Sequence, residues 1–151
     1  MYTLVRSVAL LHTPDNGAVH VDWMWSPGPG LPDPDARVLR TFRLQTTPID
    51  APPSFEAVRL PDHRARYLWF EGEIGRGLGR VQRLWSGVAR LLEWTDHRFD
   101  IELPGVNEIV RVEGVVDLGH DSSSQATIYR CTAHRRPADD IRPIGPLADQ
   151  G

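Results

Sequence analysis

Lysine is missing from this sequence, in which all 17 basic residues are arginine. A chain without lysine cannot transfer nucleotides through a covalent lysine adduct, hold a phosphate with a P-loop lysine, or form a Schiff base. Arginine is well suited to bidentate contacts with phosphate oxygens. The composition therefore excludes three kinds of lysine chemistry and leaves phosphate binding open.

Cysteine, long apolar runs and excess positive charge are also scarce. Cys131 is the only cysteine, so no internal disulfide can form. No run of 18 apolar residues predicts a membrane-spanning helix, and the N-terminus has no secretion signal. These absences predict a cytoplasmic protein without a membrane partner. The net charge of -3 argues against a broad basic surface for nucleic acid, but not against a small phosphate site.

The hydrophobic pattern has the period of β-strands. Residues 19–25 alternate between Val or Trp on one face and His20, Asp22 and Met24 on the other. Further strands are predicted over 2–12, 38–44, 67–74, 81–86, 88–94, 98–103, 110–116 and 126–133, with 60–67 either a helical turn or extended. Short strands without a long helical period predict an all-β fold, a small and mainly antiparallel β-barrel with few or short helices.

We expect one domain over residues 1–134, followed by a Pro- and Asp-rich tail over 135–151 with little order. The strand alternation also predicts a hydrophobic core. Its expected members are Leu4, Val8, Leu10, Val21, Trp23, Phe42, Leu68, Phe70, Val81, Leu92 and Ile101.

Three polar residues near the N-terminus form a candidate metal site. His20 and Asp22 share one strand face, and the Pro14–Gly17 turn would bring His12 back beside them. Two imidazoles and a carboxylate suit Mn²⁺ or Zn²⁺. A polar strand face exposed to solvent explains the same pattern, so the spacing alone leaves both interpretations open.

His63 and Tyr67 lie four residues apart, with arginines between them. On a helical turn they would share a face, where a histidine could pass a proton to a metal-bound phosphate. A packed core pair is the competing interpretation. The five tryptophans could stack on bases, but core packing explains them more simply.

Taken in order, these residues resemble a known family. The elements are His12, His20-Val21-Asp22-Trp23-Met24, Asp62-His63-Arg64-Ala65-Arg66-Tyr67 and Phe70-Glu71-Gly72-Glu73-Ile74. They resemble the 3′-phosphoesterase domain of the bacterial multifunctional DNA ligase D, and more closely its stand-alone versions. The resemblance covers about residues 3–115 and lies in order and spacing more than in any single motif.

The resemblance implies a β-barrel that removes 3′-phosphates or 3′-ribonucleotides in DNA repair by end joining. It implies Mn²⁺, or Zn²⁺ or another divalent metal, on His12, His20 and Asp22, with His63 and Tyr67 acting on the phosphate. Nucleic-acid 3′ ends and a DNA-repair ligase or polymerase are the implied partners.

The sequence departs from the family at Met24, where the family has a phosphate-binding arginine. Arg40, Arg64, Arg66 and Arg76 are the candidates to replace that cation. Three hypotheses remain: an active metal-dependent phosphoesterase, a degenerate barrel that binds metal or nucleic-acid ends without turnover, and a purely structural domain.

Overall fold

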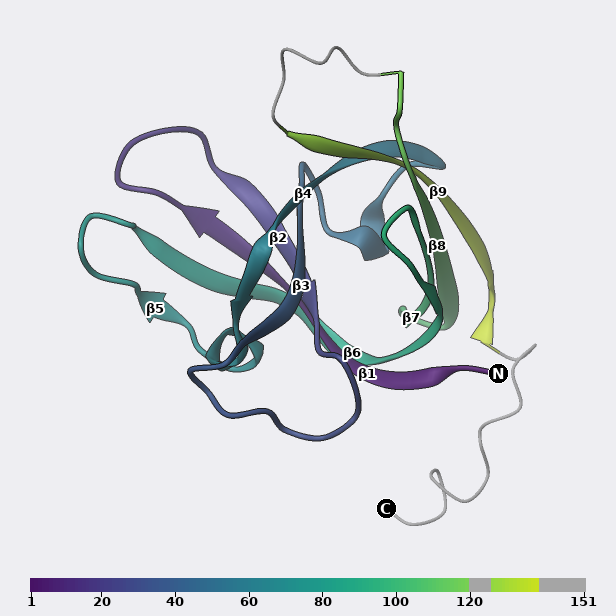
Figure 1. Cartoon of the computed structure of the whole chain (residues 1–151), viewed down its shortest axis with the longest axis horizontal. Coiled ribbons are helices and arrows are strands. Elements are labelled where there is room, and N and C mark those ends of the chain that lie inside the picture. The colour runs from purple at the N-terminus through teal and green to yellow at the C-terminus, as the bar shows by residue number, and fades with distance from the viewer. Residues whose placement is uncertain (120–125, 139–151) are drawn as a thin grey trace.

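The computed structural model describes residues 1–119 and 126–138, and β-strands dominate them (Figure 1). Two short 3₁₀ helices interrupt the strands. The elements in chain order are β1 (Thr3–Thr13), β2 (His20–Trp25), β3 (Arg37–Leu44), η1 (Pro48–Asp50), β4 (Ser54–Arg64), η2 (Ala65–Leu68), β5 (Gly72–Glu73), β6 (Arg80–Trp94), β7 (Arg98–Pro104), β8 (Glu108–Val116) and β9 (Thr127–Pro137).

The strands form one closed antiparallel barrel of eight strands, which confirms the predicted fold class. The order β1-β2-β3-β4-β9-β8-β7-β6 closes through pairing of β1 with β6, from Thr3 opposite Leu91 to Thr13 opposite Arg80. The short β5 adds to the outer edge of β6. The β1–β2 loop and the β5–β6 loop project side by side from one end (Figure 1).

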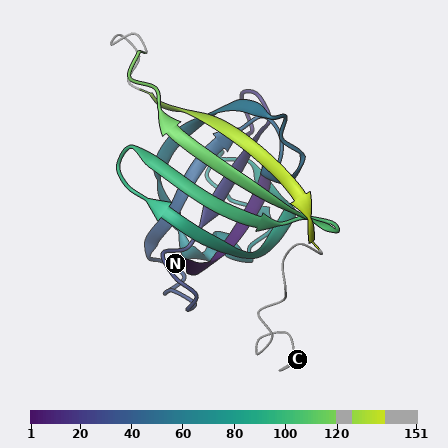
Figure 2. The same ribbon diagram turned by 90° about the vertical axis from the view of Figure 1, so that its right-hand side faces the viewer.

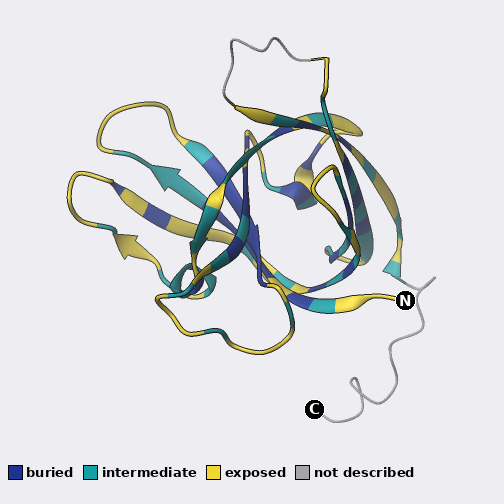
Figure 3. Ribbon diagram, in the orientation of Figure 1, coloured by how far each residue is buried: buried dark blue, intermediate teal, exposed yellow. Residues whose placement is uncertain are grey.

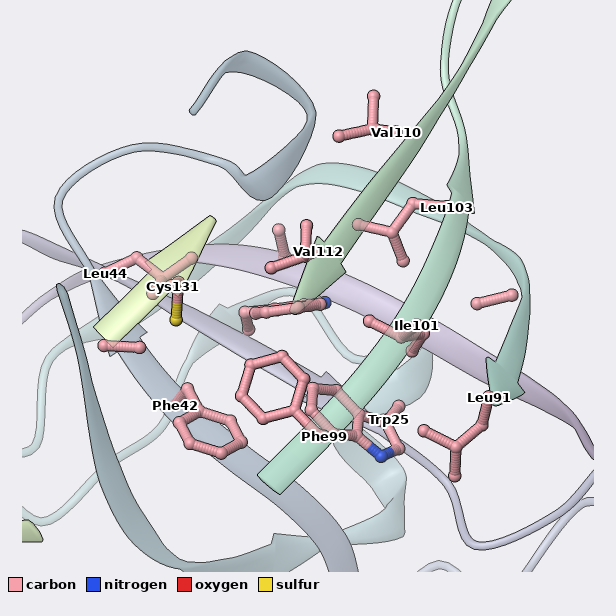
Figure 4. Packing of buried hydrophobic residues seen from close by; sticks show 14 of the residues in the cluster. Trp25, Phe42, Leu44, Leu91, Phe99, Ile101, Leu103, Val110, Val112 and Cys131 are labelled. Carbon is pink, nitrogen blue, oxygen red and sulfur yellow. The ribbon is translucent and has the colours of Figure 1, made fainter. Parts of the chain in front are cut away.

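Aromatic rings fill the barrel interior (Figure 4). The rings of Trp25 and Phe42 stack at 5.4 Å between centroids, and Phe99 and Tyr129 lie 5.0 and 5.1 Å from Phe42. Aromatic pairs at such separations add to the free energy gained by burying their area. This cluster is the main core, and inward-facing residues of all eight barrel strands contribute to it.

A second apolar cluster lies outside the barrel, on the outer faces of β1, β2, β3 and β6. Its buried members are Val8, Leu10, Met24, Leu39 and Val81. The chain from η2 to β5 covers this cluster with Tyr67, Leu68, Phe70 and Ile74. The site described below lies at one margin of this outer cluster, between the barrel wall and the covering segment.

Several predictions of individual elements were wrong in detail. Residues 67–74 were predicted to be one strand, but they contain the end of η2, a turn and the two-residue β5. The segment lies over the outside of the barrel wall and is not one of the eight barrel strands. The strand β4 begins at Ser54, although 45–54 is expected to be an irregular connection and 55–59 carried no prediction. The predicted strands 81–86 and 88–94 are one strand, which continues through Gly87.

The predicted core is divided between two clusters. Leu4, Leu68, Phe70 and Leu92 are only half-buried, whereas the other predicted members are buried. Buried positions follow the barrel strands, and the tips of the two projecting loops are exposed (Figure 3).

The strand β9 continues to Pro137, past the predicted domain end at residue 134. Residues 139–151 of the predicted tail lie outside the described part of the chain. Within the described part, no helix has the length and apolar character needed to cross a membrane.

Gly114 on β8 tests how tightly the core is packed. It lies opposite Phe99, and a Cβ atom added at Gly114 would lie 2.2 Å from the Phe99 ring. We expect Gly114→Ala to lower the free energy of unfolding by about 1–3 kcal/mol, because the ring is enclosed by other aromatics and cannot move aside. Chemical denaturation monitored by tryptophan fluorescence measures this change. Gly30→Ala, where an added Cβ meets no atom within 4 Å, should leave stability nearly unchanged.

Candidate metal centre and adjoining arginine groove

The β1–β2 hairpin brings three candidate metal ligands together. His12 lies directly opposite His20 in the ladder, and Leu10 lies opposite Asp22. Because side chains alternate along a strand, His20 and Asp22 both point to the outer face while Val21 and Trp23 point into the core. The hairpin pairing that sequence reasoning predicted is therefore the one that forms.

The ligand atoms of this trio, His12, His20 and Asp22, converge on one point. His12 Nδ1 lies 3.1 Å from His20 Nε2 and 3.5 Å from Asp22 Oδ2, and His20 Nε2 lies 3.3 Å from Asp22 Oδ1. Ligand atoms bound about 2.1 Å from one metal ion would lie about 3.0–3.4 Å apart in octahedral or tetrahedral geometry. The two histidine–carboxylate distances go to different oxygens of Asp22, and with one ligand atom from each residue the three atoms lie within 4.8 Å of one another, a group that could hold a metal ion.

Backbone carbonyls orient both imidazoles. His12 Nε2 lies 2.8 Å from the Leu78 carbonyl oxygen, and His20 Nδ1 lies 3.3 Å from that of Ala18. A carbonyl oxygen only accepts, so these nitrogens carry the ring protons and the lone pairs lie on the converging nitrogens. Metal-binding histidines in proteins are oriented in the same way.

The charges around the trio favour an added cation. The carboxylate of Asp22 is buried, and its Oδ1 accepts no hydrogen bond from any described residue. Burial lowers the pKa of His20, and the positive charge of Arg43 lowers it further, against the opposing effect of Asp22. A neutral His20 keeps its lone pair, so the trio is a group that can bind a metal ion.

A cavity of about 220 Å³ connects two members of the trio, His12 and Asp22, with His63 and Tyr67. His12, Asp22, His63 and Tyr67 supply its polar lining, and Met24 and other members of the outer cluster supply its apolar wall. The His63 and Tyr67 rings lie 6.1 Å apart, centroid to centroid. The structure therefore brings together all five of the predicted metal-binding and phosphate-directed side chains.

A second and larger hollow of about 480 Å³ adjoins this cavity and shares His63 and Tyr67 with it. We call it the arginine groove, because four guanidinium side chains line it: those of Arg37, Arg64, Arg66 and Arg76. Arg66 forms an ion pair with Asp35, whereas the other three form no ion pair with any described residue. The groove therefore carries a net positive charge beside the trio.

Arg40 is the one predicted phosphate ligand that the structure does not bring to the site. It lies opposite Trp25 in the β2–β3 ladder, and its guanidinium stacks 4.5 Å from the centre of the Trp94 ring. Strand alternation places it on the face opposite to that of the trio, and Arg40 lines neither cavity.

Sequence reasoning missed two arginines. Arg37 lines the groove, and Arg43 lies directly opposite Asp22 in the ladder, on the same outer face as the trio. The alternation of 38–44 is visible in the sequence, but the register between β2 and β3 that pairs Asp22 with Arg43 is not. Arg43 forms no ion pair with the described residues, so it adds positive charge on a second side of the metal centre.

We expect His20→Ala to abolish binding of Mn²⁺ to the metal-stripped protein, because the two remaining side chains cannot hold the ion alone. Isothermal titration calorimetry measures the affinity directly. Thermal unfolding provides a second measurement, since a metal at one hundred times its Kd should stabilise the native state by about 2.7 kcal/mol, and His20→Ala should lose that gain.

His97→Ala is the matched control, because His97 is exposed and far along the chain from the trio. It should bind Mn²⁺ like the native protein. Unchanged affinity in His20→Ala would remove His20 from the metal centre.

Gly79 positions a metal ligand through the backbone. Its φ is +87°, and an added Cβ would lie 2.1 Å from the Thr13 carbonyl oxygen. We expect Gly79→Ala to push the Leu78 carbonyl away from His12 and to weaken metal binding by about 10–100-fold, the usual effect of losing an outer-shell partner.

Gly75→Ala separates this effect from backbone strain. Gly75 has a similar φ of +88°, but an added Cβ there meets no atom within 4 Å. Titration of both variants with Mn²⁺ should show loss of affinity in Gly79→Ala alone. Equal losses would mean that strain in the loop, and not the contact with β1, controls the site.

Comparison with protein-family models and with curated proteins finds no match for this chain. The family predicted from residue order therefore stays a prediction. What the site can do follows from its own geometry: three converging ligand atoms, a histidine–tyrosine pair across a small cavity, and a groove of arginines beside them.

Proposed function

We propose that this protein is a metal-dependent phosphoesterase that acts on the 3′ ends of DNA or RNA. One observation carries the proposal: the cavity lined by His12 and Asp22 of the candidate metal-binding trio adjoins a groove of arginines and shares His63 and Tyr67 with it. A divalent ion and guanidinium groups both stabilise the negative oxygens of a phosphoryl group. Side by side, they favour a phosphate ester as the ligand.

The distribution of ion pairs supports an anionic ligand at this place. On the face of β7, β8 and β9 (Figure 2), each arginine is held by a carboxylate; these are Arg98, Arg111, Arg130, Arg135 and Arg136. In the groove, Arg37, Arg64 and Arg76 form no ion pair with any described residue. The chain has 20 acidic residues against 17 arginines, so carboxylates are not scarce. These three groove arginines lack a counter-charge because the carboxylates lie elsewhere.

The resemblance to 3′-phosphoesterase domains supplies the finer parts of the proposal. It is the basis for 3′ ends as the substrate, for Mn²⁺ as the metal, and for a role in DNA repair beside a ligase or polymerase. Two imidazoles and one carboxylate suit Mn²⁺ or Zn²⁺ and leave positions for water and a phosphate oxygen.

The proposed chemistry divides among the residues of the two cavities. A metal bound by His12, His20 and Asp22 would polarise the phosphoryl oxygen and lower the pKa of a bound water. His63 Nδ1 donates to the Pro61 carbonyl oxygen at 2.8 Å, so in the imidazolium form its Nε2–H would be the proton passed to the leaving oxygen, which leaves a neutral imidazole. Arg64 and Arg76 would hold the phosphate through paired hydrogen bonds.

The second candidate function is binding of nucleic-acid ends without turnover, and Met24 favours it. Met24 is 1% exposed and packs in the outer cluster beside Asp22. An apolar wall there supplies no hydrogen bond to a transition state, and one lost donor of this kind costs about 3–4 kcal/mol in related sites. The unpaired Arg43 and the arginine groove are the groups that could replace it.

The proposal is tested with purified protein, Mn²⁺ and a primer–template that bears a 3′-phosphate or a single 3′-ribonucleotide. We expect removal of the 3′ group, and a loss of about 10²–10⁴-fold in kcat in His63→Gln, which removes the proton donor. Mn²⁺ affinity should be unchanged in that variant, since His63 is not among the trio. Gel analysis of the labelled primer measures the rate.

Arg64→Gln and Arg130→Gln form a matched pair for the role of the groove. Arg64 lines the groove without an ion pair, whereas the exposed Arg130 is held by Glu56 and Asp117 on the far side of the barrel. Only Arg64→Gln should lower kcat/KM. Binding of the primer end with no product in any variant would favour the second function, and absence of both binding and product would overturn both.

A further inference from the structure

One of the five tryptophans differs from the rest in its surroundings. Trp23 and Trp25 are fully buried in the barrel core, and Trp85 and Trp94 pack against that core. Trp69 is 44% exposed and follows η2, outside the barrel. Core packing therefore explains four tryptophans and leaves Trp69 without a structural explanation.

Trp69 lines a hollow of about 420 Å³ on the outer face of β1 and β6. We call it the Trp69 pocket; its lining includes Arg6, Leu31, Leu68, Trp69, Ser86 and Val88. Leu31 and Val88 are exposed, at 67% and 54%. Arg6 donates from Nε to the Pro29 carbonyl oxygen and forms no ion pair with the described residues. The pocket therefore combines a flat aromatic ring, aliphatic side chains and a guanidinium without a counter-charge.

The Trp69 pocket and the arginine groove share one short segment of chain. Arg64, Arg66 and Tyr67 line the groove, and the next two residues, Leu68 and Trp69, line the pocket. Backbone hydrogen bonds fix this segment, from Ala65 N to Ala36 O at 2.9 Å and from Trp69 N to Arg66 O at 3.1 Å. A ligand that leaves the groove across η2 meets a tryptophan held in a defined place.

The strand β1 gives the distance between the same two places. Arg6 lies at the Trp69 pocket and His12 at the metal centre, with Val8 and Leu10 between them on the same face. Six residues of strand span about 20 Å. A nucleic-acid strand with its 3′ end at the trio is long enough, within a few nucleotides, to reach Trp69.

We propose that the Trp69 pocket is a stacking subsite for a nucleobase of the bound strand, a few nucleotides from the 3′ end at the metal centre. The inference rests on the proposed function, since it takes the strand in the groove as given. The indole ring stacks on the base, and Arg6 contacts the adjoining phosphate. Every base has a π-face, so the subsite holds the strand without reading its sequence.

The test measures binding alone, in EDTA, with a fluorescent primer–template that carries one abasic site at successive positions from the 3′ end. For the native protein we expect one position where loss of the base weakens binding by about tenfold. Trp69→Leu should bind the intact strand about tenfold more weakly and should show no further penalty at that position. Trp69→Phe, which keeps a ring, should restore most of the affinity and the penalty.

Tyr2→Leu is the matched control, because Tyr2 is an aromatic residue with a similar exposure of 41% near Arg90 and outside the pocket. It should bind every strand as the native protein does. Circular dichroism and thermal unfolding of each variant establish that the barrel is intact.

The outcomes separate this inference from the proposed function. Unchanged binding by Trp69→Leu, or an abasic penalty that persists in it, overturns the stacking subsite even where 3′-phosphate removal is robust. An abasic-site penalty that is lost in Trp69→Leu and restored in Trp69→Phe, without removal of the 3′ group, supports the subsite and the second, non-catalytic function. Absence of any strand binding overturns the subsite.

Discussion

The antiparallel pairing of β1 with β6 is the contact on which both the barrel and the site depend. It runs the full length of β1 and closes the barrel, because it joins the first and the last of the eight barrel strands. At its far end, Thr13 lies opposite Arg80, which brings the preceding loop against the backbone of Thr13. That approach places the Leu78 carbonyl on His12, so barrel closure and orientation of a candidate metal ligand have one cause.

Strand alternation then divides the chain into two environments. Inward residues of β2 join an aromatic core, and outward residues of the same strand carry a carboxylate and an imidazole. Burying a carboxylate is costly unless a cation or hydrogen bonds compensate it. The stable core therefore supports a polar group that is itself destabilising without a cation, as is common at functional sites.

The sequence was sufficient to predict that His12, His20 and Asp22 come together and to predict the fold class, because both depend on local pattern. The alternation over 19–25 and the Pro14–Gly17 turn specify one hairpin, and that hairpin alone assembles His12, His20 and Asp22. Order and spacing also identified His63 and Tyr67, which the structure brings to the same cavity. Here local chemistry and the observed geometry agree.

Non-local pairing limited the remaining predictions. Arg40 and Arg43 lie on one strand, and their spacing of three residues puts them on opposite faces. Which face meets the trio depends on the register with β2, which is set by the core packing of Trp23 against Phe42 and not by any local signal. The same limit hid the start of β4, whose pairing partner β9 lies far along the chain.

Met24 shows how the outer cluster and the site constrain each other. A cation at this position would have to lie within a buried apolar cluster that holds the covering segment in place. The guanidinium groups come instead from the ends of β3 and β4, from η2 and from the glycine-rich loop before β6. Of these four arginines, only Arg66 lies within the segment that covers the outer cluster, and Arg64 and Arg76 flank that segment. Packing of this segment on the barrel wall therefore stabilises the outer cluster and also places Arg66, with Arg64 and Arg76 beside it, at the groove.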